Sequence, residues 1–102
     1  MILDDIRNIK PQIIALSDAY GIGDIRVFGS VARGEADENS DIDFLVSLKK
    51  PIGFEFAKYV MQLTNLLNRK VDVVTEQALK PSMKQQVYKD AVPLWKEAML
   101  NT

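Results

Sequence analysis

The feature that most constrains the fold of this chain is a polar segment, residues 29–43 (GSVARGEADENSDID), that separates two short runs of β-forming residues. The first run, Ile25-Arg26-Val27-Phe28, ends in a Gly-Ser turn, and the second, residues 41–46 (DIDFLV), begins with two aspartates. Because strand side chains alternate between faces, Asp41 and Asp43 should point to one side, with Cα atoms roughly 6.5–7 Å apart. The pattern predicts a pair of carboxylates held on a rigid strand.

The two ends of the polar segment favour complementary chemistry. Two close carboxylates repel each other unless they share a cation, and oxygen ligands favour Mg²⁺, with Mn²⁺ as the alternative. At the other end, Gly29 can adopt backbone angles that other residues avoid, and Ser30 adds a hydroxyl donor. The amides of such a turn suit a phosphate. A metal–nucleoside triphosphate would therefore satisfy both ends.

The rest of the chain predicts an α/β architecture in one domain, residues 1–102, with a small mixed β-sheet backed by helices. Apolar periodicity and turn residues predict a kinked helix or two short helices over residues 3–19, a strand over 24–29, a turn or short helix over 30–34, a polar loop over 35–40, a strand over 41–48, a helix over 52–68, a strand over 70–75, a helix over 82–91 and a short closing segment, 93–95.

An isolated acid marks the third predicted strand. Asp72 lies in Lys70–Thr75 (KVDVVT), among valines. A carboxylate in an apolar strand is costly unless it is ion-paired or bound to a metal. Asp72 is therefore a candidate partner of Asp41 and Asp43.

Two other phosphate- or metal-binding patterns fail here. Gly29 and Gly34 have P-loop spacing, but Glu35-Ala36 stands where Lys-Ser/Thr is needed. An apparent calcium loop starting at Asp37 lacks its glycine and its final glutamate. Arg33 remains a candidate phosphate ligand, with a surface salt bridge as the alternative.

Composition excludes several classes of chemistry. With no cysteine and no histidine, the chain cannot form disulfides, thiolate or histidine metal sites, or a Ser-His triad. The net charge is −1, so we do not expect direct nucleic-acid binding. The carboxy-terminal half is nevertheless basic, with nine Lys/Arg against five Asp/Glu in residues 49–102. The charged amino terminus and the lack of a long apolar run predict a cytoplasmic protein with no membrane contact.

The combined motif resembles a known family. Gly29-Ser30, ten intervening residues, Asp41-x-Asp43 and the distant Asp72 resemble the DNA polymerase β-like nucleotidyltransferase superfamily, and the run GSVARGEADENSDIDFLV looks like its minimal nucleotidyltransferase branch. The resemblance implies a polymerase β-like palm in which Asp41, Asp43 and Asp72 are catalytic and bind two Mg²⁺ ions. It also implies that Gly29 and Ser30 hold the β- and γ-phosphates of ATP, where Arg33 could assist.

The resemblance also indicates a reaction and a partner. Some minimal nucleotidyltransferases are antitoxins that transfer AMP from ATP to a tyrosine of a HEPN-domain ribonuclease toxin. We therefore expect a Mg²⁺-dependent protein adenylyltransferase in a hetero-oligomer with a HEPN toxin, with a homodimer as the alternative assembly. The basic carboxy-terminal half and Trp95 are candidate contacts.

Two alternative functions stay open at this stage. The chain could neutralise a toxin by occlusion alone, with no catalysis. It could instead be the catalytic subunit of an enzyme that modifies a small molecule such as an aminoglycoside. The sequence does not fix the acceptor, the base preference or the number of nucleotides transferred.

Overall fold

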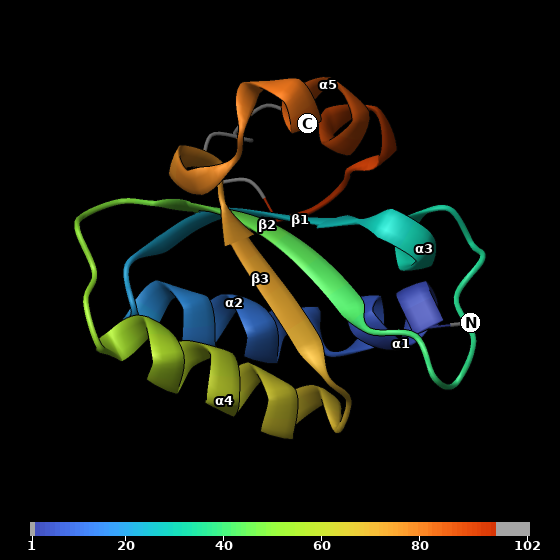
Figure 1. Ribbon diagram of the computed structural model, residues 1–102. Helices are drawn as coiled ribbons and strands as arrows, with labels where there is room; N and C mark the ends of the chain where they lie inside the picture. The colour runs from blue at the N-terminus through green and yellow to red at the C-terminus, as the bar shows by residue number, and fades with distance from the viewer. Residues whose placement is uncertain (1, 96–102) are drawn as a thin grey trace, which may run out of the picture.

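The computed structural model describes residues 2–95, which form a four-stranded mixed sheet with helices on both faces (Figure 1). The strand order is β3-β2-β1-β4. The central strand β1 is antiparallel to both β2 and β4, whereas β2 and β3 are parallel. The strands are β1 (Ile22–Phe28), β2 (Ile42–Leu48), β3 (Val71–Thr75) and β4 (Val92–Trp95). The predicted small mixed sheet backed by helices is thereby confirmed.

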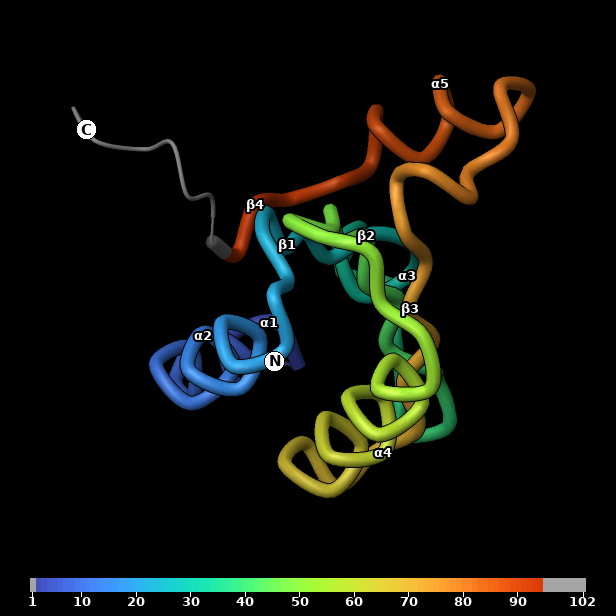
Figure 2. The backbone as a smooth tube through the Cα atoms, turned by 90° about the vertical axis from the view of Figure 1, so that its left-hand side faces the viewer, coloured from blue at the N-terminus to red at the C-terminus, as the bar shows by residue number. Residues whose placement is uncertain are grey.

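The two faces of the sheet are covered differently. Helices α1 (Ile2–Asn8), α2 (Lys10–Ala19) and α4 (Glu55–Leu67) lie on one face, and α5 (Pro81–Asp90) lies on the other, as Figures 1 and 2 show. The larger apolar core, which includes Ile13, Phe44 and Tyr59, lies under the three helices. Under α5 lies a smaller cluster of buried residues, Leu45, Leu79 and Val87.

The connection between β1 and β2 carries the polar segment singled out in the sequence. The short helix α3 (Gly29–Ala32) follows β1 directly, and a loop then leads to β2. Between β3 and α5 the chain forms the short 3-10 helix η1 (Glu76–Ala78). The C-terminal end of β1 and the N-terminal ends of β2 and β3 lie together at one end of the sheet, because Phe28 pairs with Asp43 and Asp43 pairs with Asp72.

The structure differs from the sequence prediction mainly at residues 92–95, whereas the amino-terminal segment matches one of its two predicted alternatives. It forms two short helices, α1 and α2, separated at Ile9, with Pro11 in the first turn of α2. Residues 92–95 form a strand paired with β1, where only a closing segment was predicted. This strand depends on pairing with a distant partner, which local sequence does not reveal. The side chain of Trp95 lies outside the described part of the chain.

Within residues 2–95, no helix combines the length and apolarity that crossing a membrane requires.

Candidate active site

The two strand aspartates lie side by side on the α5 face of the sheet. In β2, Ile42 and Phe44 point into the larger core, so Asp43 points to the opposite face, which it shares with Leu45. Asp43 and Asp72 are direct register partners in the parallel pair β2–β3. Adjacent strands lie about 4.8 Å apart, and register partners project to the same face. The structure thus brings together two acids that are 29 positions apart in the sequence.

The surroundings of Asp43 disfavour its negative charge. Burial raises the pKa of its carboxyl group above 3.8, and the nearby charges of Asp72 and Asp41 raise it further. The positive charge of Arg33 acts in the opposite direction and is the smallest of these causes. A site with this electrostatic balance favours a cation or a proton.

The side chains of Asp41 and Asp72 are both accessible to solvent. Asp41 immediately precedes β2, and its side chain is 44% exposed, with Lys70 Nζ 3.6 Å from its Oδ2. Asp72 is exposed as well. An ion pair this exposed and this long contributes little to stability, and it leaves the Asp41 carboxylate accessible to a ligand.

The donor set fits a hard divalent cation, because Asp41, Asp43 and Asp72 all offer carboxylate oxygens. Among residues 2–95, however, no three acidic side chains are already arranged around a common point where a metal ion would sit. Assembly of a three-carboxylate site would therefore require rotation of the exposed side chains of Asp41 and Asp72 toward Asp43.

The Gly-Ser turn lies directly against Asp43. Phe28, the last residue of β1, is the register partner of Asp43, and Gly29 follows with φ +74°. A Cβ atom added to Gly29 would collide with Oδ2 of Asp43. Glycine is therefore required here both by its backbone conformation and by the close approach of the carboxylate. Ser30 occupies the first turn of α3, so the predicted phosphate-binding turn and the carboxylate pair adjoin each other.

Arg33 is held by two carboxylates. Its Nε lies 2.9 Å from Oε1 of Glu35, and its Nη1 lies 2.8 Å from Oδ2 of Asp90 in α5. These hydrogen bonds raise the pKa of Arg33, and the bond from Arg33 lowers the pKa of Asp90. The salt bridge that the sequence left as an alternative is therefore present. A role for Arg33 toward phosphate stays a prediction.

Arg69 holds the loop that leads into β2, a role that sequence reasoning missed. Its Nη1 donates to the backbone carbonyls of Asp37, Glu38 and Ser40 at 3.0, 3.2 and 3.0 Å. Within the same loop, the Ser40 hydroxyl accepts from the backbone N–H of Asp37. The only sequence signal for Arg69 was its position just before the strand that carries Asp72.

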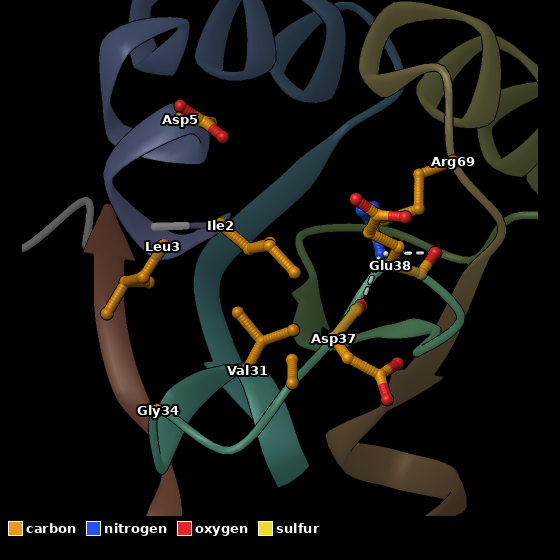
Figure 3. A pocket seen from close by; sticks show the side chains of 9 residues that line it. Ile2, Leu3, Asp5, Val31, Gly34, Asp37, Glu38 and Arg69 are labelled. Carbon is orange, nitrogen blue, oxygen red and sulfur yellow. Dashed lines mark hydrogen bonds between the residues drawn. The ribbon is translucent and has the colours of Figure 1, made fainter.

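The loop held by Arg69 also lines an open cavity of about 380 Å³ beside α1 and α3 (Figure 3). Its lining includes Ile2, Leu3, Val31 and Asp37, but none of the three predicted catalytic aspartates. The cavity is thus separate from the carboxylate pair, and its lining gives no reason to place the chemistry there.

Comparison with known proteins places this geometry in a family. Residues 9–94 match the model of the nucleotidyltransferase domain family. The protein adenylyltransferase MntA of Thermococcus cleftensis is 37% identical over 78 residues, which cover 76% of this chain and 79% of that protein.

Solved structures agree with the sequence comparison. A candidate minimal nucleotidyltransferase superposes with a TM-score of 0.80 at 38% identity, covering 91% of this chain and 96% of the other. A chain of a toxin–antitoxin complex crystallised with AMP-PNP has a TM-score of 0.74 at 26% identity, covering 87% of this chain and 74% of the other. The protein described here belongs to the nucleotidyltransferase domain family and is a nucleotidyltransferase.

Proposed function

We propose that this nucleotidyltransferase transfers AMP from ATP to a tyrosine hydroxyl of a HEPN-type toxin and so acts as its antitoxin. The observation that carries the proposal is the in-register pair Asp43 and Asp72 beside the Gly29 turn. The names of the relatives support the choice of reaction and partner, since one is a protein adenylyltransferase and another belongs to a toxin–antitoxin complex with an ATP analogue.

Mg²⁺ held by Asp41, Asp43 and Asp72 would supply charge neutralisation at the triphosphate and polarise its α-phosphoryl group. The turn amides after Phe28 and the hydroxyl of Ser30 donate hydrogen bonds to the β- and γ-phosphates. Arg33, close enough to Asp43 to affect its pKa, adds positive charge on the same side.

The reaction itself is an in-line displacement. The acceptor oxygen forms a bond to the α-phosphorus while the bond from that phosphorus to the bridging oxygen breaks, and pyrophosphate leaves. The exposed carboxylate of Asp72 is positioned to accept the hydroxyl proton. The residues of this chain contribute mainly placement and charge, which dominate catalysis in this class of reaction.

The test compares Asp43→Asn with Asp4→Asn, a matched change at an exposed acid of α1. Purified HEPN-type partner is incubated with Mg-ATP and each variant, and intact-mass analysis follows the addition of AMP. We expect Asp43→Asn to lose at least about 100-fold in rate, because the substitution removes one of the proposed Mg²⁺ ligands. Each tenfold loss corresponds to about 1.36 kcal/mol of lost transition-state stabilisation. Asp4→Asn should react normally, and chelation of Mg²⁺ should stop both.

Normal transfer by Asp43→Asn would refute the proposed site. A partner that never gains AMP, together with full growth rescue by Asp43→Asn when the toxin is expressed, would instead indicate neutralisation by occlusion. Transfer of labelled AMP to an aminoglycoside in a panel of acceptors, with none to the partner, would indicate a small-molecule enzyme.

A further inference from the structure

The outer edge of β3 carries unused backbone hydrogen-bonding groups next to the carboxylate pair. β3 is the last strand of the sheet on this side, and within residues 2–95 no strand pairs with its outer edge (Figure 1). The N–H of Ile42 donates to the carbonyl of Lys70 at 3.1 Å, which fixes the alternation of the parallel ladder. The backbone N–H and C=O groups of residues 70, 72 and 74 therefore point toward β2, whereas those of Val73 point outward.

The two edges of the sheet are protected to different extents. Natural edge strands usually carry proline, lysine or a bulge, which discourage pairing with another chain. β4 contains the exposed Pro93, which has no N–H to offer. β3 (VDVVT) has none of these devices, and its side chains Val73 and Val74 are only half-buried. The unprotected edge is thus the one that carries Asp72.

We propose that the outer edge of β3 binds an extended segment of the protein acceptor, which pairs with β3 as an additional strand and so delivers its hydroxyl to Asp72. The proposal rests on the proposed function and specifies how its protein substrate is recognised. Main-chain hydrogen bonds would give such a segment affinity, and its alternate side chains would give it specificity.

The geometry explains why this edge suits a hydroxyl-bearing residue. An added strand would lie about 4.8 Å from β3, and the residue opposite Asp72 would project to the same face as Asp72 and Asp43. A tyrosine side chain is long enough to cross one such inter-strand spacing. It could therefore reach over Asp72 toward Asp43 and the Gly29 turn.

A backbone-specific substitution tests the proposal. Val73→Pro removes the outward N–H of Val73 and leaves the bonds to β2 in place, and Val73→Ala is the matched control that keeps the N–H. With the HEPN-type partner as acceptor, we expect Val73→Pro to lower kcat/KM at least about tenfold, because the edge can no longer pair. The Kd for Mg-ATP should not change, and Val73→Ala should resemble the wild type.

A second measurement keeps the test decisive if Val73→Pro fails to fold. In the unmodified protein, the Val73 and Thr75 amides should exchange with solvent more slowly once the partner is bound. Equal exchange rates with and without partner would overturn the proposal, as would wild-type transfer by folded Val73→Pro. Protection that rises with protein concentration in the absence of partner would also overturn it, because a second copy would then occupy the edge.

Failure of the edge-binding proposal can be distinguished from failure of the proposed function. If Asp43→Asn abolishes transfer and Val73→Pro does not, the enzyme is as proposed and only the edge binding is wrong. If transfer survives Asp43→Asn, the proposed function itself is wrong.

Discussion

At the scale of single residues, Asp43 has an environment that disfavours its negative charge. It is partly buried, it faces Asp72 across the strand pair, and Gly29 leaves just enough room for its carboxylate. Each of these features favours either a proton or a cation at this position. Asp43 should therefore reduce the stability of the metal-free protein at neutral pH.

This conflict predicts a pH-dependent effect of Asp43→Asn on stability. The pKa of Asp43 is raised in the folded protein, so the folded state binds the proton more tightly than the unfolded chain does. Its contribution is most favourable below a pH of about 3.8 and is lost as the pH rises through the folded pKa. Without metal, Asp43→Asn should therefore raise Tm at pH 7 and have a smaller effect at pH 3.5, as measured by thermal melting over a pH series.

Added Mg²⁺ provides a control for the effect of the Asp43 charge on stability. It should raise the Tm of the wild type at pH 7, since a ligand that binds only the folded state stabilises it, and should have less effect on Asp43→Asn. A Tm difference between the two proteins that stays constant from pH 3.5 to 7 would show that the charge of Asp43 is not the cause.

At the scale of elements, the loop between α3 and β2 depends on an arginine from the far end of α4. Arg69 follows Asn68, whose left-handed conformation (φ 52°) ends α4. The turn that ends the helix therefore directs the Arg69 side chain toward the loop, where one nitrogen contacts three carbonyl groups. Because the loop ends at Asp41, the placement of Asp41 depends on this contact.

We expect Arg69→Ala to loosen the loop while the sheet stays folded. Amides of residues 35–41 should exchange faster with solvent, and stability should fall by roughly 1 kcal/mol, since most of the lost bonds are exposed. Nucleotidyl transfer should fall by about 10- to 100-fold, because small displacements of a reacting group are costly. Hydrogen exchange, urea unfolding and the transfer assay measure these effects.

Arg7→Ala, at an exposed arginine of α1, is the matched control for loss of a positive charge. It should leave both the loop and the activity unchanged. If Arg69→Ala transfers AMP at the wild-type rate while its loop exchanges faster, the loop does not position Asp41 for the reaction.

At the level of elements, some features were predictable from the sequence and others were not. The strands that carry Asp43 and Asp72 were predictable, because β-forming runs and an isolated acid are local signals. The pairing of β4 with β1 and the contact between Arg33 and Asp90 were not, because each joins segments far apart in the chain. For Arg33, the sequence offered phosphate binding and a salt bridge equally, and only the position of α5 places Asp90 beside it.

At the scale of the whole molecule, the two faces of the sheet differ in composition. The face under α1, α2 and α4 holds most of the apolar core, and the opposite face holds the carboxylates. α5 covers part of that opposite face, held partly by a small apolar cluster and partly by polar contacts such as Arg33 to Asp90 at 2.8 Å. The core face thus supports an opposite face that carries Asp43 and Asp72 and has fewer buried apolar residues.

One buried hydrogen bond ties the core-face helices together. The hydroxyl groups of Ser17 in α2 and Tyr59 in α4 lie 2.8 Å apart, and both residues are fully buried. Each hydroxyl satisfies the other in a place where water does not reach. Loss of one hydroxyl would leave the other without a hydrogen-bond partner, whereas loss of both would leave an apolar contact between the two helices.

A double-mutant cycle follows from this arrangement. Ser17→Ala and Tyr59→Phe should each destabilise the protein by about 1–3 kcal/mol, because each leaves a buried hydroxyl unpaired. For a domain of this size, 1 kcal/mol corresponds to a Tm change of roughly 4–8 °C. The double variant should be clearly more stable than the sum of the single effects predicts, as measured by urea unfolding. Strict additivity would show that the two hydroxyls do not depend on each other, and AMP transfer at 25 °C should be unaffected in all three variants because this bond lies on the face away from Asp43.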